Sequence, residues 1–130
     1  MCIRDRIKPL TIGELRAKAE AGDFGAQFQM GMKANNGADG LKRSPSAAEK
    51  WWLRAAAQGH AYAQMNLGML YSRGALGEKD PAKAYQWTKL SLTRGNQRAK
   101  QLVEKLEEEL TQEQITPANA FVKGYKPVKE

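Results

Sequence analysis

Side chains that commonly carry out catalysis or bind metals are few in this chain, and they are scattered. His60 is the only histidine and Cys2 the only cysteine among 130 residues. No cysteine or carboxylate stands at ligand spacing from His60, whereas a metal site needs three or four such ligands. A lone histidine that no motif places beside a serine and an aspartate does not make a hydrolytic triad either. The sequence therefore predicts no catalytic residue, no metal site and no enzymatic activity.

Two further segments resemble functional sites in composition but not in spacing. The glycine-rich loop at residues 37–40 lacks the Gly-Lys-Ser/Thr ending of a phosphate-binding loop. The glutamates between residues 104 and 109 are expected to form a solvated acidic helix face. No cofactor is expected.

The positions that do follow a rule are those of an internal repeat. Six residues recur at a constant offset of 37 positions: Gly22, Ala26, Gln27, Gly31, Met32 and Gly37 recur as Gly59, Ala63, Gln64, Gly68, Met69 and Gly74. A second set recurs at an offset of 36: Pro45, Ala48, Trp51 and Gly59 recur as Pro81, Ala84, Trp87 and Gly95. A period in this range is typical of stacked helical units, which present a surface to a partner.

Start and stop signals place helices on this repeat. Ser-Pro at 44–45 and Asp-Pro at 80–81 begin helices, because proline lacks the amide that would be unpaired there. Glycines end helices by accepting a left-handed backbone. These signals predict helices over residues 11–21, 23–36, 44–58, 60–73, 80–94 and 96–110. A short last helix from 111 is expected to be interrupted or restarted at 116–117, with a tail from 123.

Glycines also stand in the middle of two equivalent helices. Gly31 and Gly68 each cost about 1 kcal/mol there relative to alanine. Because the same costly residue occurs twice, we expect another helix to pass close to each. The equivalent Trp51 and Trp87 are expected to fill the space between hairpins.

The repeated residues resemble the Sel-1-like repeat family, a relative of the tetratricopeptide repeat, and bacterial members in particular. The residues that carry this resemblance are Ala61, Ala63, Gln64, Leu67, Gly68, Tyr71, Gly74, Asp80, Lys83, Ala84 and Trp87. Ala55, Ala56, Gln58 and Gly59 match the helix ending of the preceding repeat, whereas Ala34, Ser91 and Leu92 depart from the pattern. The resemblance implies an all-α fold, a right-handed superhelix of antiparallel hairpins with about two full repeats and terminal capping helices. It also implies a non-enzymatic protein–protein interaction scaffold or adaptor.

This reading divides the chain into three parts. Residues 1–10 are expected to form a disordered tail, whose first six resemble a translated sequencing-adapter remnant of a gene model. Residues 11–110 hold the repeat domain, with repeats at 22–58 and 59–94 and a closing helix at 96–110, and residues 111–130 hold a short helix and a basic tail. No signal peptide and no apolar run of about 18 residues is visible. If the first six residues are such a remnant, the natural N-terminus and any export signal are missing, so periplasmic, secreted and cytoplasmic locations all stay open.

The net charge of +7 is concentrated near the two ends of the chain. Loose basic ends do not make a phosphate-binding face, and no aromatic residues interleave with a tight Lys/Arg cluster. Nucleic acid is therefore disfavoured as a partner. A basic nucleic-acid-binding module, or a fragment of a longer repeat array, is kept as the alternative function.

In tetratricopeptide-like stacks the first helix of each hairpin lines the concave face. If this chain is aligned on that pattern, a protein or peptide partner is expected to bind Phe28, Met32, Asn35, Tyr62, Met65, Met69, Ser72, Arg73, Arg98, Gln101 and Lys105. The pairs Phe28/Met32 and Met65/Met69 would form apolar stripes suited to varied side chains. The competing hypothesis is that these stripes pack inside the fold. Self-association through this face is also open.

Overall fold

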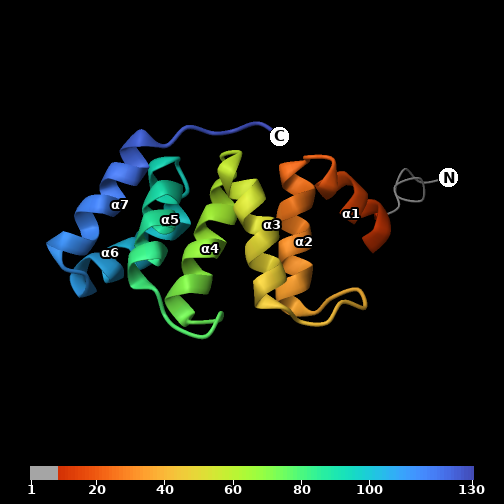
Figure 1. Cartoon of the computed structure of the whole chain (residues 1–130), viewed down its shortest axis with the longest axis horizontal. Coiled ribbons are helices and arrows are strands. Elements are labelled where there is room, and N and C mark those ends of the chain that lie inside the picture. Colours follow the sequence, from red (N-terminus) through yellow and green to blue (C-terminus); the bar gives the residue numbers. More distant parts are fainter. Residues whose placement is uncertain (1–8) are drawn as a thin grey trace.

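The computed structural model describes residues 9–130, and the segment 1–6 discussed above lies outside them. Within these residues every regular element is a helix (Figure 1). The helices are α1 (Ile12–Glu20), α2 (Phe24–Asn36), α3 (Pro45–Ala57), α4 (Ala61–Arg73), α5 (Pro81–Thr93), the 3₁₀ helix η2 (Gln97–Ala99), α6 (Lys100–Glu109) and α7 (Gln112–Gly124). Antiparallel hairpins stack side by side into the predicted all-helical solenoid.

The helices begin where the repeat places polar caps. Asp23, His60 and Asn96 stand at equivalent positions, and each accepts a hydrogen bond from a backbone amide in the turn that follows. Ser44 and Asp80 do the same at the proline-started helices α3 and α5. These bonds pair amides that a helix start leaves without partners.

Both mid-helix glycines lie directly under a neighbouring helix, as predicted. A Cβ added at Gly31 would lie 2.2 Å from Nε1 of Trp52, and one at Gly68 would lie 2.2 Å from Cγ2 of Thr88. Trp52 is 2% exposed and its Nε1 donates to the carbonyl of Phe28 at 3.1 Å. The prediction for the tryptophans was partly wrong. Trp51 and Trp87 are half-buried and pack against the edges of the two cores, whereas Trp52, the neighbour of Trp51, fills the space between α2 and α3.

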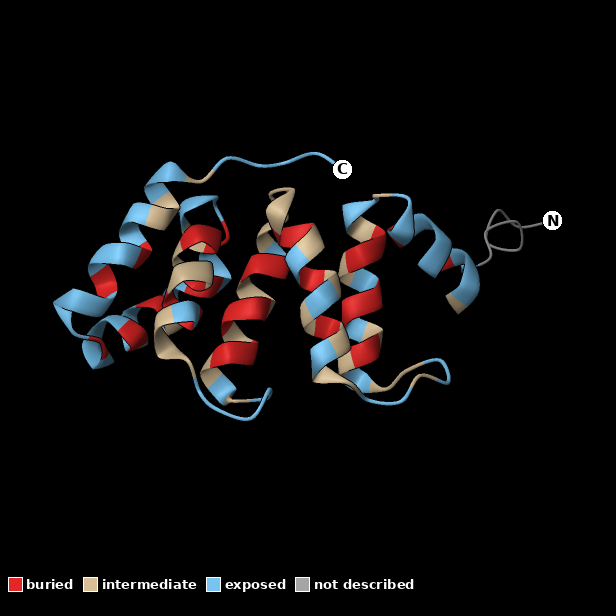
Figure 2. Cartoon of the chain, viewed as in Figure 1, coloured by how far each residue is buried: buried red, intermediate tan, exposed pale blue. Residues whose placement is uncertain are grey.

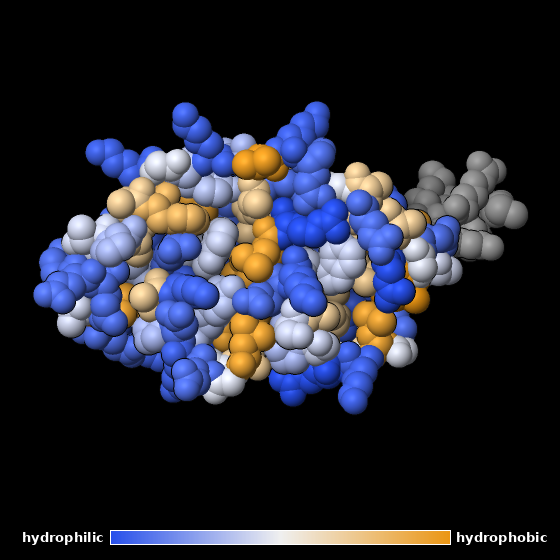
Figure 3. Space-filling view, viewed as in Figure 1, coloured by the Kyte–Doolittle hydropathy of each residue, from blue (hydrophilic) through white to orange (hydrophobic). Residues whose placement is uncertain are grey.

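From α1 to α5 each helix packs against the next along the chain, and both α6 and α7 pack on α5. Buried residues form stripes on the helix sides that face these neighbours (Figure 2). One core runs from α2 to α7, and a smaller one joins α1 to α2 around Leu15 and Met30. In the view of Figure 3, hydrophilic side chains cover most of the surface and apolar ones gather near its middle. Among the described helices, none is both long and apolar enough to cross a membrane.

Two expectations for the end of the chain were wrong. The last helix is not interrupted at Thr116-Pro117, because α7 runs unbroken through Pro117 with Ile115 and Ala118 packed in the core. The segment Tyr125–Glu130, which we call the strap, is not a free tail. It passes back along the solenoid and contacts the carboxyl end of α3 (Figure 1). The expected closing helix also begins as the 3₁₀ helix η2 before α6.

Candidate binding face

The residues expected to line a binding face lie on α2, on α4 and on the η2–α6 segment. None of them is buried, and Met32, Tyr62, Arg73, Arg98, Gln101 and Lys105 are exposed. We call the surface that they form the A-helix face. Nine of the eleven line two adjoining hollows that share Met69 and Arg73.

The first hollow lies between α2 and α4 and has a volume of about 230 Å³. Met32 and Asn35 line it from α2, and Asn66 and Met69 line it from α4. Arg43 adds a cation from the loop after α2, where its Nε donates to the carbonyl of Asn35 at 3.2 Å.

The second hollow lies between α4 and α6 and has a volume of about 550 Å³. Met65, Met69, Ala99 and Leu102 supply its apolar lining. Four cationic side chains surround it, those of Arg73, Lys79, Arg98 and Lys105. No carboxylate within residues 9–130 lines either hollow, so the second hollow carries positive charge only.

Arg43 and Lys79 are the two cations of this face that the sequence interpretation missed. They stand at an offset of 36, the spacing of the second set of repeats. The predicted residues all lie on α2, α4 and the η2–α6 segment, whereas these two cations lie on the loops that close the hollows. The repeat offset was the signal that would have found both residues.

The remaining two predicted residues, Phe28 and Tyr62, meet in an aromatic group at the amino end of α4. The ring centroid of His60 lies 4.7 Å from that of Phe28 and 6.2 Å from that of Tyr62. The guanidinium of Arg98 lies 5.8 Å from the centre of the Tyr62 ring. Nδ1 of His60 accepts the amide hydrogen of Ala63 at 3.1 Å. Burial lowers the pKa of His60 below its usual value of 6.5.

The methionine stripes are divided between the hollows and the core. Phe28 and Met65 are half-buried and pack against the main core, whereas Met32 is 37% exposed. Amide groups reach two of the sulfur atoms: Asn66 donates to Sδ of Met32 at 3.2 Å, and Asn96 donates to Sδ of Met65 at 3.4 Å. Phe28 therefore packs on the core, Met65 both packs on the core and lines the second hollow, and Met32 and Met69 face the hollows.

Two buried tyrosines are hydrogen-bonded to carboxylates without forming a reactive site. The hydroxyl of Tyr71 donates to Glu49 at 2.7 Å, and that of Tyr85 donates to Glu107 at 3.0 Å. Burial and the nearby carboxylate raise the pKa of both phenols, that of Tyr85 to about 12. Both therefore stay protonated. Residues 9–130 hold no group of three or more histidine, cysteine or acidic side chains that could bind a metal ion.

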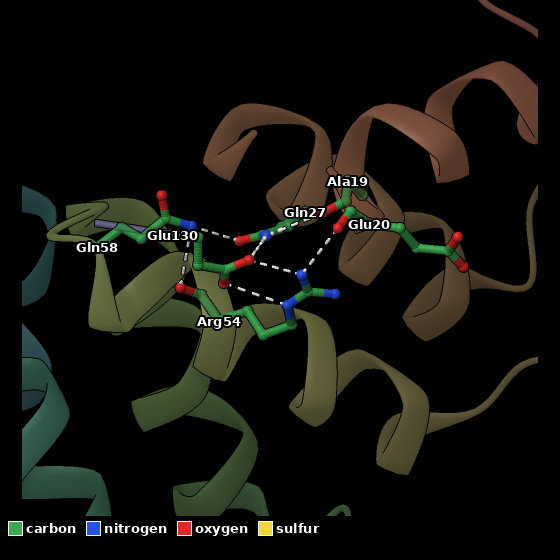
Figure 4. A network of polar contacts seen from close by, with 6 residues as sticks. All are labelled: Ala19, Glu20, Gln27, Arg54, Gln58 and Glu130. Atoms are coloured by element: carbon green, nitrogen blue, oxygen red, sulfur yellow. Dashed lines mark hydrogen bonds and ion pairs between the residues drawn. The ribbon is translucent and has the colours of Figure 1, made fainter. Parts of the chain in front are cut away.

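The polar network around the strap was also missed. Glu130 reaches the side chains of Arg54 and Gln27 at the junction of α1, α2 and α3 (Figure 4). Gln27 also donates to the carbonyl of Ala19 and accepts from Gln58. The repeat pattern marks Gln27, through its equivalent Gln64, but the strap lies beyond the repeats.

The model for the Sel1 repeat matches residues 25–60 and 61–96, which together make up more than half of the chain. The chain belongs to the Sel1 repeat family. Members of this family are in general protein-interaction scaffolds, and the hollows lie between successive Sel1 hairpins. The matched segments each begin near the cap of a first helix and end near the next cap, in agreement with the stacked hairpins.

Two solved Sel1-type structures resemble this one. The first is c5321, a protective antigen present in uropathogenic Escherichia coli strains that displays an SLR fold, with a TM-score of 0.81 and 28% identity. The match covers 95% of this chain and 27% of that protein, so the chain spans about a quarter of its length. The second is a Sel1 repeat protein from Oxalobacter formigenes, with a TM-score of 0.57, 24% identity and coverage of 84% and 97%. It supports the fold alone. No curated protein matches the chain.

Proposed function

We propose that this Sel1 repeat protein is a non-enzymatic adaptor that binds an acidic, partly apolar peptide segment of a partner protein on the A-helix face. The observation that carries the proposal is the second hollow. Its apolar lining comes from Met65 and Met69, and its rim holds four cations and no carboxylate of the described chain. Unbalanced positive charge of this kind attracts a negatively charged partner and selects against a basic one.

The shape of the surface favours an extended segment over a small molecule. The two hollows adjoin at Met69 and Arg73, so a peptide that follows α4 would contact both. Methionine side chains are flexible and polarizable, which suits apolar side chains of different shapes. The side-chain amides of Asn35 and Gln101 could hydrogen-bond a peptide backbone, because neither forms a side-chain hydrogen bond within residues 9–130 and Asn35 accepts from Arg43 only through its backbone carbonyl.

Fluorescence anisotropy tests the proposal with a labelled ten-residue peptide of alternating glutamate and leucine. Replacing Arg73 and Arg98 together by glutamine removes two of the four cations, and we expect at least about a tenfold loss of affinity, equivalent to about 1.4 kcal/mol. The matched control replaces Arg16 and Lys123 by glutamine, which removes the same charge from α1 and α7. Equal losses in both double variants would show only general charge attraction.

A peptide with lysine in place of glutamate and a single-stranded ten-nucleotide DNA complete the test. We expect the lysine peptide not to bind. If the DNA binds more tightly than the acidic peptide, with an affinity that falls steeply with salt, the protein-adaptor proposal is wrong and the nucleic-acid alternative replaces it.

A further inference from the structure

The strap is anchored at two points on the side of the first repeat, outside the A-helix face. It leaves α7 and runs back past α5 and α4 towards α2 and α3 (Figure 1). Between its two anchors, the amide of Val128 donates to the carbonyl of Ala57 at 2.8 Å.

The first anchor is the tyrosine at the start of the strap. The hydroxyl of Tyr125 lies 2.6 Å from the carbonyl oxygen of Ala56 and 3.0 Å from that of Ala57. Both carbonyls belong to the last turn of α3, where a helix leaves its carbonyls to be paired from outside. The carbonyl of Ala56 also accepts from the amide of Gly59 and from Nε2 of Gln64. The guanidinium of Arg94 lies 5.5 Å from the centre of the Tyr125 ring and covers it.

The second anchor is the carboxylate of Glu130. Its Oε1 accepts from Nη2 of Arg54 at 2.6 Å, and its Oε2 accepts from Nε of Arg54 at 3.2 Å. Oε1 also accepts from Nε2 of Gln27 at 3.0 Å (Figure 4). This two-pronged pairing fixes the direction of the carboxylate as well as its charge.

The groups that receive the carboxylate are held by the repeats themselves. Gln27 is fully buried, and its amide bonds the carbonyl of Ala19 and the side chain of Gln58. Arg54 donates to the carbonyl of Glu20, and its guanidinium lies 5.3 Å from the centre of the Trp51 ring. These contacts do not involve the strap. Gln27 and Arg54 are therefore held in position independently of it, which lowers the entropy cost of binding a carboxylate between them.

Each anchor lies beside one copy of a hydrogen bond that the repeat duplicates, from a glutamine side chain to a backbone carbonyl. Gln27 donates to the carbonyl of Ala19, and its equivalent Gln64 donates to the carbonyl of Ala56, which also receives Tyr125. The strap thus places a phenol at the carboxyl end of α3 and a carboxylate at the junction of α1, α2 and α3, and the two residues are five apart in sequence.

From this arrangement we propose that the surface formed by Gln27, Arg54 and the carboxyl end of α3 is a second peptide-binding site. Its ligand is an extended segment that carries a tyrosine hydroxyl and, five residues later, a glutamate carboxylate. The strap Tyr125–Glu130 occupies this site reversibly, so the same segment of a second molecule competes for it.

Fluorescence anisotropy tests this with a labelled peptide of the sequence 124–130. In the released variant, Tyr125→Phe with Glu130→Gln, the strap loses both anchors while α7 stays in place. We expect this variant to bind the peptide at least about fivefold more tightly than the wild-type chain, whose own strap holds most of the site closed. A peptide with phenylalanine and glutamine in place of the tyrosine and glutamate should not bind.

Arg54→Lys in the released variant keeps the charge but loses the two-pronged geometry, and we expect it to weaken peptide binding at least about fivefold. The matched control, Lys50→Arg, alters the same helix one turn earlier and should have no effect. Equal binding by wild-type and released chains, or binding by neither, overturns the proposal. Hydrogen exchange of the Val128 amide in the unaltered chain gives an independent measure, and exchange as fast as in the free peptide also overturns it.

Discussion

At the scale of single residues, the contact between Gly68 and Thr88 leaves no room for a side chain. A Cβ at Gly68 would lie 2.2 Å from Cγ2 of Thr88 and 3.0 Å from the carbonyl oxygen of Ala84. We expect Gly68→Ala to lower the free energy of unfolding, because overpacking costs about 1–3 kcal/mol and outweighs the gain of about 1 kcal/mol in helix propensity. Urea denaturation measures the change.

Two further variants separate packing from propensity. Gly13→Ala adds its Cβ with nothing closer than Thr11 Oγ1 at 4.0 Å, so we expect a gain of up to about 1 kcal/mol. Thr88→Ser removes the methyl group that meets the new Cβ and should recover part of the loss in a Gly68→Ala background. A stabilising Gly68→Ala would contradict the close contact.

The same contacts show what residue patterns could predict. Gly31 and Gly68 revealed a close approach because a costly residue recurs in register. The partners were not predictable in this way, since Trp52 and its equivalent Thr88 share neither size nor chemistry. Trp51 was predicted to fill the space between hairpins because it recurs as Trp87, but it is half-buried, and the adjacent Trp52 is the residue that makes the contact. Residues that are identical in both repeats therefore predicted the glycine of each contact, but not the larger side chain that packs on it.

At the scale of elements, the start of α4 depends on the protonation of His60. Its Nδ1 accepts the Ala63 amide hydrogen, which requires the neutral ring, and burial lowers its pKa below 6.5. The unfolded chain therefore binds a proton at a higher pH than the folded chain does. We expect the free energy of unfolding to fall as pH drops below about 6.5 and to level off below the folded pKa. Chemical denaturation between pH 5 and 8 measures this.

The variant His60→Asn provides the control. Asparagine is the residue at the equivalent cap of η2, and it does not titrate. Because His60 is the only histidine, we expect the stability of this variant to stay nearly constant over that pH range. If the wild-type chain and the variant show the same pH dependence, His60 is not its source.

Helix positions were predictable to within a few residues wherever caps and prolines agreed, as at Ser44-Pro45 and Asp80-Pro81. The exception is α7. Pro117 removes a backbone donor and usually ends a helix, but Ile115 and Ala118 beside it are buried against the core. Tertiary packing outweighs the local preference there, and a single sequence gives no measure of that packing.

At the scale of the whole molecule, the strap joins the last helix to the first repeat. Arg54 lowers the pKa of Glu130, so the contribution of this pair to stability is present above pH 4.5 and is lost as pH falls through the lower, folded pKa. Both side chains are partly exposed, so we expect Glu130→Gln to lower the free energy of unfolding at pH 7 by at most about 1 kcal/mol. The difference should shrink as pH falls below 4.5.

Thermal or urea unfolding of Glu108→Gln supplies the comparison, because Glu108 is exposed and forms no ion pair within residues 9–130. We expect that variant to change stability by a few tenths of a kcal/mol at most. An equal effect of the two substitutions would mean that the ion pair between Glu130 and Arg54 contributes nothing to global stability.

The arrangement of the A-helix face was largely predictable, because it follows from the register of α2 and α4. The positions of Arg43 and Lys79 depend on how loops close over the hollows, and the strap depends on contacts between residues more than 60 positions apart. Repeat spacing describes each unit and its neighbour, and it does not describe a segment that crosses two units.

Because the strap is anchored at both ends, its length limits how far α7 can lie from the first repeat. Six extended residues reach about 20 Å, and one additional hairpin, with helix axes about 8–10 Å apart, would move α7 away by nearly that distance. A chain with a third repeat inserted between α3 and α4 would keep both mid-helix glycine contacts, because each joins the two helices of one hairpin, but Glu130 would no longer reach Gln27. The strap therefore fixes the number of hairpins between α2 and α7, a constraint that no individual repeat contains.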